Sequence, residues 1–347
     1  MSEKENKIRV GISIGDLNGI GIEVILKTFE DPRMMEFCTP VVFGATKTFS
    51  FQKKVFKLST NFVGISDASE IVHGKMNVVN VIKDIPNVEF GKETKAAGDV
   101  ALQSLKAAVA ALKADEIDVL VTAPINKYNI QNEEFNFPGH TDYLATELEG
   151  DSLMFMISDT LRIGLLTDHV AVKDVAGAIT PEVIERKIAT VEKCLIEDFS
   201  IQKPKIAMLG INPHSGDNGV IGNEDDTVMK PTVKKLFEEG KMVFGPYAAD
   251  SFFGSDSYKQ FDAVIAAYHD QGLIPFKTLS FGKGVNYTAG LSKVRTSPDH
   301  GTAYGIAGKG EADQSSFIEA VFAAIKIFNN REDYKLLSAN PLVKSDN

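Results

Sequence analysis

The sequence is poor in cysteine, has no excess of basic residues and contains no long apolar run. Only Cys38 and Cys194 occur in 347 residues, and they lie far apart in no paired motif, which is typical of a reduced cytoplasmic protein with structural thiols. Lys and Arg number 37 against 47 Asp and Glu, a formal net charge of -10, and no basic stripe alternates with aromatic residues. A nucleic-acid partner is therefore excluded. No segment is long enough to span a bilayer, and the charged start MSEKENKIRV lacks the apolar core of a signal peptide, so we expect no membrane association.

What is present is the composition of a globular protein, with 44% hydrophobic and 24% charged residues over a length that favours two packed domains. Apolar runs such as KIRVGISIG and IDVLVTAPIN alternate with helical patterns such as KAAGDVALQSLKAAVAALKADE and PEVIERKIATVEKCLIEDF. This alternation predicts an α/β fold whose mainly parallel sheet is covered by helices on both faces. The turn-rich stretch QNEEFNFPGHTD is the best candidate for a crossing between domains.

Three predicted strands in the second half each end on a histidine. LRIGLLTDH ends at His169, KPKIAMLGINPH at His214, and FDAVIAAYHD just after His269. Ligands of open α/β sheets bind outside the carboxyl ends of the strands, so these imidazoles can converge on a divalent ion such as Zn²⁺. A single histidine in such a loop more often only forms a hydrogen bond, but three of the six histidines in one structural position favour a metal site.

Further polar residues surround the same strand ends. GHTDYLA places His140 and Thr141 at the start of a helix, where they either cap it or face an anion. Lys277 follows the third histidine, and VNYTAGLSKVRTSPDHGTA contains Asn286 and Arg295. Arginine suits a phosphate or carboxylate, although an isolated arginine is more often part of a surface ion pair.

A glycine-rich loop, DHGTAYGIAGKG, precedes the final amphipathic helix and could present its backbone amides to a nucleotide. Neither this loop nor GDLNGIGIE matches a dinucleotide fingerprint or a phosphate-binding loop, and both could be simple turns. The residues we assign to a nucleotide are Asp299, His300, Gly301, Thr302 and Gly308.

Taken together, the segments GDLNGIGIE, TAPINK, GHTDYLA, NPHSGDNGVIGNED, GPYAADSFF, YHDQGLIPFK, VNYTAGLSKVRTSPDHGTA and IAGKG resemble the 4-hydroxythreonine-4-phosphate dehydrogenase family of vitamin B6 biosynthesis, from about residue 8 to residue 330. The resemblance implies an isocitrate/isopropylmalate dehydrogenase-like architecture, with two α/β/α domains flanking a central cleft and NAD or NADP bound outside a Rossmann fold. We place the first, nucleotide-side domain at residues 1–130 plus 280–347 and the second at 131–279.

The resemblance also implies roles for the residues above. In the family the histidines matching His169 and His214 bind a divalent metal (Zn, Mg, Mn or Co) with the one matching His269 from the other subunit, so the active site is shared within a homodimer. The family's substrate-binding positions match His140, Thr141, Lys277, Asn286 and Arg295. Asp250 matches an acidic residue at the site.

The implied reaction is oxidation of 4-phosphohydroxy-L-threonine at its C3 hydroxyl by NAD, followed by decarboxylation to 3-amino-2-oxopropyl phosphate, in pyridoxal phosphate biosynthesis. A metal lowers the pKa of the hydroxyl and then polarises the new carbonyl, so one site can run both steps. Asp250 and Asp270 are both candidates for the base, and each could instead orient a metal-bound histidine. Lys277 is the third catalytic candidate and would also hold phosphate or carboxylate oxygens.

The chain departs from the family pattern in two loops. The first usually reads GDPAGIGPE, where this chain has Leu17, Asn18 and Ile22, and the nucleotide loop often carries an acid at the position of Gly305. The first change removes proline's fixed φ, and the second leaves the choice between NAD and NADP open. Two alternative functions are a paralogue that oxidises another phosphorylated hydroxy acid, such as a four-carbon sugar acid phosphate, and a phosphate acyltransferase on the same scaffold.

Overall fold

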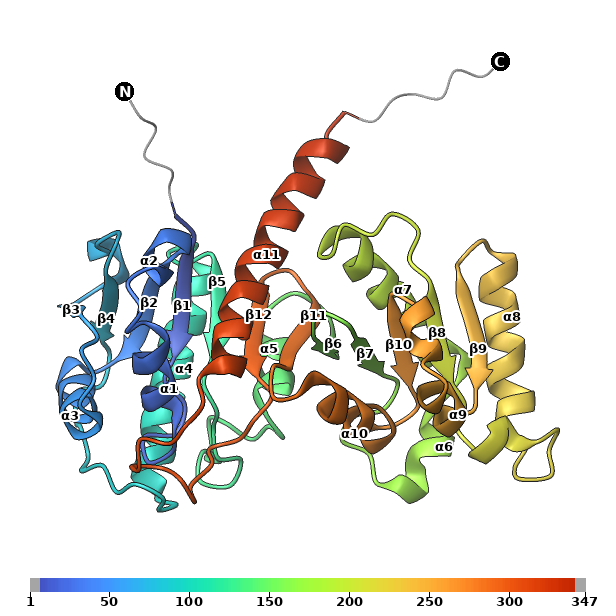
Figure 1. The fold of residues 1–347 in the computed structure, drawn as a ribbon, viewed down its shortest axis with the longest axis horizontal. Coiled ribbons are helices and arrows are strands. Elements are labelled where there is room, and N and C mark those ends of the chain that lie inside the picture. Colours follow the sequence, from blue (N-terminus) through green and yellow to red (C-terminus); the bar gives the residue numbers. More distant parts are fainter. Residues whose placement is uncertain (1–6, 341–347) are drawn as a thin grey trace. The chain divides into compact units, whose positions relative to one another are not determined.

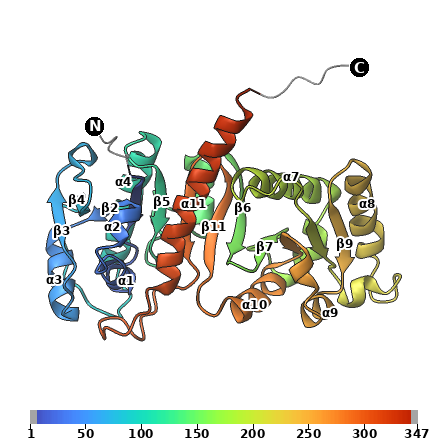
Figure 2. The same ribbon diagram turned by 45° about the horizontal axis from the view of Figure 1, so that its top comes forward.

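The computed structural model describes residues 7–340, which divide into two compact units. Unit 1 comprises Met1–Ser152 and Phe281–Ile325, and unit 2 comprises Leu153–Ser280 and Lys326–Asn347. Figures 1 and 2 show the helices and strands of each unit from two directions. From the sequence we place the two domains at residues 1–130 plus 280–347 and at residues 131–279. Those domain boundaries stay a prediction.

Unit 1 contains a mainly parallel sheet with the strand order β3-β4-β2-β1-β5-β12-β11. Neighbouring strands are parallel except for the last pair, β11 and β12, which is antiparallel. The carboxyl ends of the parallel strands therefore lie along one edge, where β11 begins. The strands are β1 (Arg9–Ser13), β2 (Thr39–Gly44), β3 (Phe62–Ile65), β4 (Met76–Asn80), β5 (Val119–Thr122), β11 (Val285–Leu291) and β12 (Val294–Pro298).

Helices cover the sheet of unit 1. The long helix α4 begins where the side chain of Thr94 accepts a hydrogen bond from the Ala97 amide, and its apolar face packs on β1, β2 and β5. The core between them includes Val41, Leu105 and Leu120, all fully buried. The helices are α1 (Gly21–Thr28), α2 (Met34–Phe37), α3 (Thr46–Phe56), α4 (Lys95–Lys113), α5 (His140–Glu147) and the first part of α11 (Ser315–Ser338).

Unit 2 contains a second run of strands in the order β6-β7-β10-β8-β9. All neighbours are parallel except for β6 and β7. Residues 263–266 of β10 are fully buried between β7 and β8, as expected of a central parallel strand. The strands are β6 (Gly150–Ile157), β7 (Arg162–Leu165), β8 (Ile206–Leu209), β9 (Val243–Tyr247) and β10 (Ala263–Ala266).

The helices of unit 2 have clear sequence signals. Helix α7 begins with the side chain of Thr180 accepting from the Val183 amide and with Pro181 in its first turn. Helix α10 packs on β7 and β10, and its Phe276 belongs to the apolar core of the unit. The helices are α6 (Val175–Ala178), α7 (Pro181–Glu197), α8 (Lys230–Glu238), α9 (Ala249–Gly254) and α10 (His269–Ser280).

The α/β fold with a mainly parallel sheet and covering helices is confirmed. Across residues 7–340, no helix combines the length and apolar character needed to cross a membrane. One detail differs from the sequence prediction. The three strands of unit 2 end at Leu165, Leu209 and Ala266, before their histidines, because strand pairing stops there and the chain turns away from the sheet.

Candidate functional site

In unit 1, Arg295 is a buried cation with no acidic partner. The side chain is 2% exposed, and it is one of the largest fully buried side chains in the described chain. Its guanidinium donates to the hydroxyls of Thr122, at 2.5 and 3.2 Å, and Thr288, at 3.0 Å, and no carboxylate pairs with it in residues 7–340. Burial lowers the pKa of Arg295 to about 9. A charge buried without a counter-ion is costly, so this arrangement suits a site that receives an anion.

Strand pairing aligns further polar groups beside Arg295. Asn286 on β11 lies opposite Ser297 on β12, and Thr288 follows two residues later on the same face. The Oδ1 atom of Asn286 is shielded from solvent and accepts no hydrogen bond within the described residues. This face of β11 and β12 thus carries a buried cation, Arg295, next to the Asn286 oxygen, which could accept a hydrogen bond from a ligand.

His140 is the first residue of α5, and its imidazole is neutral. Burial, followed by the positive charges of Arg295 and Lys127, holds the pKa of His140 well below its usual 6.5. Its Nε2 is shielded from solvent and has no hydrogen-bond partner among residues 7–340. The next residue, Thr141, is 8% exposed. Unit 1 therefore brings His140 into the electrostatic range of Arg295, and a neutral ring can serve an anion's oxygens as a hydrogen-bond donor without adding charge.

In unit 2, the three predicted metal ligands follow parallel neighbours in the order β7, β10, β8. His169 and His214 are exposed, and His269 is partly exposed as the first residue of α10. Nδ1 of His269 lies 2.7 Å from a carboxylate oxygen of Asp270. In the part of the chain that the structure describes, no three His, Cys, Asp or Glu side chains are grouped so that they could hold one metal ion. Residues 7–340 of one chain alone therefore do not assemble a three-ligand site.

Two residues that sequence patterns do not single out connect these strand ends. The side-chain amide of Gln271 accepts from the Ala267 amide and donates to the Gly210 carbonyl, both at 2.7 Å, and so joins the ends of β10 and β8. The hydroxyl of Thr167 donates to the Ala267 carbonyl at 2.7 Å and joins the ends of β7 and β10. The only sequence signal for Gln271 is its position two residues after His269.

The loop that carries His214 has an uncommon backbone. Six consecutive residues, 214–219, have positive φ values, starting with 52° at His214. For residues other than glycine this conformation costs about 1–2 kcal/mol each. The buried carboxylate of Asp225 holds the start of the loop by accepting from the amides of Ile211, at 2.8 Å, and Asn212, at 2.9 Å. Strained backbone fixed by buried contacts is frequent at functional sites.

The remaining predicted residues of unit 2 are exposed. Asp250 lies in α9, just beyond β9, where the Ser251 hydroxyl donates to it at 3.4 Å. Lys277 lies in the second half of α10 on its exposed side. Asp250 is thus a solvated carboxylate, and Asp270 is occupied with His269.

The predicted nucleotide residues lie between β12 and α11 in unit 1. The amide of Asp299 donates to the Ser316 hydroxyl in the first turn of α11, at 3.1 Å, and the Thr302 carbonyl accepts from a backbone amide after β1. His300 has an Nε2 that is buried without a partner among the described residues. Gly308 has a φ of 81°, and a Cβ there would lie 2.6 Å from the Phe90 ring. The loop is fixed at several points and contains an unsatisfied polar atom, which fits the binding of a polar cofactor.

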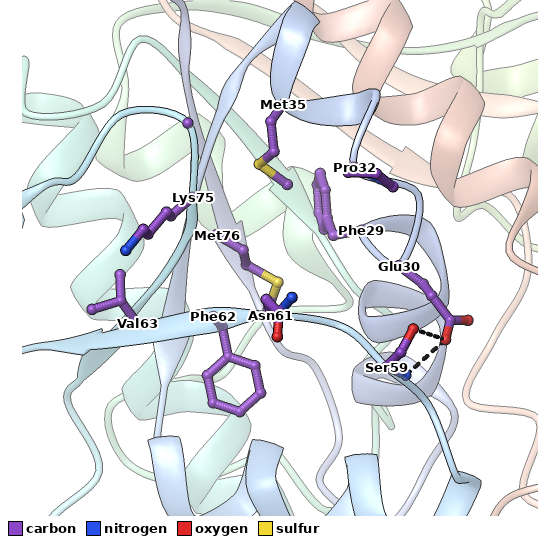
Figure 3. A pocket seen from close by; sticks show the side chains of 11 residues that line it. Phe29, Glu30, Pro32, Met35, Ser59, Asn61, Phe62, Val63, Lys75 and Met76 are labelled. Atoms are coloured by element: carbon purple, nitrogen blue, oxygen red, sulfur yellow. Dashed lines mark hydrogen bonds between the residues drawn. The ribbon is translucent and has the colours of Figure 1, made fainter.

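A separate pocket of about 810 Å³ lies at the opposite ends of the unit 1 strands, where β3 and β4 begin (Figure 3). Figure 3 shows apolar side chains such as Phe29, Met35 and Met76 around it, with Lys75 on the far side. Glu30 at the rim accepts two hydrogen bonds from Ser59. None of the predicted site residues lines this pocket.

Comparison with known proteins gives concordant matches. The family model described as pyridoxal phosphate biosynthetic protein PdxA matches residues 36–324. The chain is 48% identical over 343 residues to the 4-hydroxythreonine-4-phosphate dehydrogenase of Bacteroides thetaiotaomicron, a match covering 98% of this chain and 94% of that protein. It is 35% identical over 327 residues to the D-threonate 4-phosphate dehydrogenase of Cupriavidus necator, covering 93% and 98%.

The fold is also similar to solved structures. The crystal structure of 4-hydroxythreonine-4-phosphate dehydrogenase from Klebsiella pneumoniae matches with a TM-score of 0.80 at 29% identity. The match covers 94% of this chain and 99% of that one. Sequence and fold therefore point to the same group of proteins.

Proposed function

The chain belongs to the family of the pyridoxal phosphate biosynthetic protein PdxA, and on that premise we propose that it is a dehydrogenase that oxidises 4-phosphohydroxy-L-threonine with NAD and then decarboxylates the product. The proposal depends mainly on one observation: the guanidinium of Arg295 is buried beside the neutral imidazole of His140, and no carboxylate among the described residues pairs with it. A substrate with a phosphate and a carboxylate supplies the negative charge that this cation lacks.

The substrate's anionic groups are held by Arg295 and Lys277, with hydrogen bonds from His140, Thr141 and Asn286. Because the Arg295 fork is already fixed by two threonine hydroxyls, little side-chain entropy is lost when an anion binds. Because its pKa is lowered, His140 stays neutral at pH values where an ordinary histidine would be protonated, so its ring keeps one N–H donor and one acceptor. These contacts orient C3 of the substrate for reaction.

The proton of the C3 hydroxyl needs a base, and we assign that role to Asp250. Asp270 is engaged with Nδ1 of His269, which is the position of a carboxylate that orients a metal-binding imidazole. Within residues 7–340, Asp250 has only the Ser251 hydroxyl as a partner and is exposed, so its carboxylate is available to the substrate. Hydride leaves C3 as the C3–O–H proton moves to the base; then the C1–C2 bond breaks, CO₂ departs and C2 is protonated.

Two bound groups complete this chemistry. The chemistry of the donor set fits a divalent ion, because His169, His214 and His269 supply imidazoles at neighbouring strand ends, and we propose that a second copy of the chain contributes His269. Such an ion would polarise the hydroxyl and the carbonyl formed from it. NAD or NADP would accept the hydride, held by the loop of Asp299, His300, Gly301, Thr302 and Gly308.

The proposal is tested by following reduction of NAD with 4-phosphohydroxy-L-threonine before chelation, after chelation and after divalent ions are restored. Turnover that disappears with the chelator and returns with the metal is expected. A folded, metal-loaded protein that gives no turnover refutes the proposal.

The second candidate function is oxidation of D-threonate 4-phosphate, and the similarity to the Cupriavidus necator protein favours it. The two substrates differ only in whether C2 carries an amino group or a hydroxyl, so both should be assayed side by side. The ratio of their kcat/KM values decides between the two functions, with the higher 48% identity predicting a preference for the amino acid.

A further inference from the structure

The carboxylate of Asp16 connects three loops at the site edge of unit 1. Asp16 is 1% exposed, and no Lys, Arg or His forms an ion pair with it in residues 7–340. It accepts hydrogen bonds from the Asn18 amide at 2.9 Å, from the Asn129 side chain at 2.7 Å and from the Tyr304 hydroxyl at 2.9 Å. The donors come from the loops after β1, β5 and β12. A buried charge requires such donors, so the three loops are fixed to one another through this carboxylate.

Asn18 extends the connection to a fourth segment. Its side chain donates to the Lys92 carbonyl at 2.9 Å and to the Thr94 hydroxyl at 3.1 Å, and it accepts from the Glu89 amide at 2.8 Å. The Asn18 carbonyl accepts from the Gly91 amide at 2.9 Å. Asn18, one of the departures from the family pattern, is therefore fully used in holding residues 89–94 against the first loop.

Tyr304 is the contact between this network and the predicted nucleotide loop. Burial, followed by the negative charge of Asp16, raises the pKa of Tyr304, so its hydroxyl remains a donor at all ordinary pH values. The close approach is visible in the backbone as well, because a Cβ on Gly91 would lie 2.9 Å from the Tyr304 carbonyl. The Tyr304 side chain thus fixes the nucleotide loop to Asp16 at a place where the backbones of Tyr304 and Gly91 are already in contact.

The far end of the same loop has its own anchor on α1. Lys27 donates to the carbonyls of Gly310, at 2.9 Å, and Ala312, at 2.6 Å, and Glu23 accepts from the Ala312 amide at 2.9 Å. Residues 305–309 lie between this anchor and Tyr304. Removal of the Tyr304 hydroxyl would therefore release the middle of the loop from one side only and leave the rest of the fold in place.

We propose that Tyr304, through the Asp16 carboxylate, is a positioning residue for the dinucleotide cofactor. The inference rests on the proposed function, in which residues 299–308 hold NAD. The hydrogen bond orders the loop before the cofactor arrives, so less conformational entropy is lost on binding. A hydrogen bond to a charged group is strong enough that its loss should weaken NADH binding about tenfold.

The test compares Tyr304→Phe with Tyr128→Phe. Tyr128 lies on the neighbouring loop after β5 and is 79% exposed, so the second variant removes the same atom without touching the network. NADH binding is measured by calorimetry, and backbone amide exchange is measured over residues 299–310 without ligand. We expect about tenfold weaker NADH binding and faster exchange in Tyr304→Phe only, with the KM of the phosphorylated substrate unchanged at saturating NAD.

Three outcomes separate the explanations. Wild-type NADH affinity in Tyr304→Phe overturns the inference while leaving the proposed function intact. A lower melting temperature with unchanged NADH affinity and unchanged exchange in the loop would also overturn it, because Tyr304 would then serve stability alone. If the wild-type protein itself binds neither NADH nor NADPH, the proposed function fails, and the inference fails with it.

Discussion

Replacement of Arg295 by methionine should separate the residue's role in binding from its role in stability. The side chain is buried, and burial lowers its pKa from its usual high range to about 9. At about 1.4 kcal/mol per pH unit, this depression corresponds to roughly 5 kcal/mol of cost for holding the charge in the free protein. Arg295→Met removes that cost and fills a similar volume with an apolar chain.

The substitution also removes favourable contacts. The hydroxyls of Thr122 and Thr288 lose their guanidinium donor, at a cost of about 1–3 kcal/mol each. The two effects largely offset each other, so the free energy of unfolding should fall by no more than about 2 kcal/mol. Catalysis should suffer far more, since loss of two charged hydrogen bonds to an anion of about 1.5–3 kcal/mol each lowers kcat/KM by at least about 100-fold.

The assay combines chemical unfolding with steady-state kinetics and adds a binding arm with inorganic phosphate. Phosphate should raise the melting temperature of the wild type and leave that of Arg295→Met unchanged. The exposed Arg186 of α7 provides the control, and Arg186→Met should leave stability, kinetics and the phosphate response unaltered. A loss of stability of about 3 kcal/mol or more with nearly normal kcat/KM would refute the reasoning and make Arg295 a structural residue.

Three further predictions concern the other parts of the site. Because the folded-state pKa of His140 lies well below 6.5, its contribution to stability is complete above pH 6.5 and is lost as the pH falls. His140→Gln should therefore lose less stability than the wild type between pH 7 and pH 5, and an identical pH dependence would contradict a buried neutral ring. Inactive His169→Ala and His269→Ala proteins should regain activity when their subunits are exchanged, and failure after proven exchange would rule out a shared site. Gly308→Ala should weaken NADH binding because its Cβ would meet an aromatic ring at 2.6 Å, whereas Gly305→Ala, with open space around it, should bind normally; equal binding by both would show that the loop adapts.

Local patterns predict the secondary structure of this chain well. The apolar run KIRVGISIG contains β1, and KAAGDVALQSLKAAVAALKADE contains α4, since strand and helix each impose their own spacing on buried residues. Glycine, asparagine and aspartate in NPHSGDNGVIGN indicate an irregular turn around His214. Six consecutive left-handed residues could not be foreseen, because such a backbone depends on the buried Asp225 that holds it.

The residue type at a strand end indicates which side chains could act in binding or catalysis. The burial and the partners of each side chain decide which of these roles it can have. His140, Asn286 and Arg295 could be named from the sequence, where an isolated arginine would ordinarily belong to a surface ion pair. In the structure Arg295 is buried against a threonine 173 positions away, and no acid accompanies it within the described residues. Gln271, Asp225 and Tyr304 lie in segments that the sequence marks, but their residue types do not indicate their roles, since each acts by joining segments that are distant in the sequence or by fixing a neighbouring loop.

The sequence by itself determined the α/β class and the set of ionisable residues available for catalysis, because hydrophobic period and residue type are local properties of the chain. Only the tertiary structure decided which of these residues are buried, which lack a counter-charge and which loops share a hydrogen-bonding partner. Burial and pairing depend on groups far apart in sequence, and the free energy of a charge changes by several kcal/mol according to whether such a group is beside it.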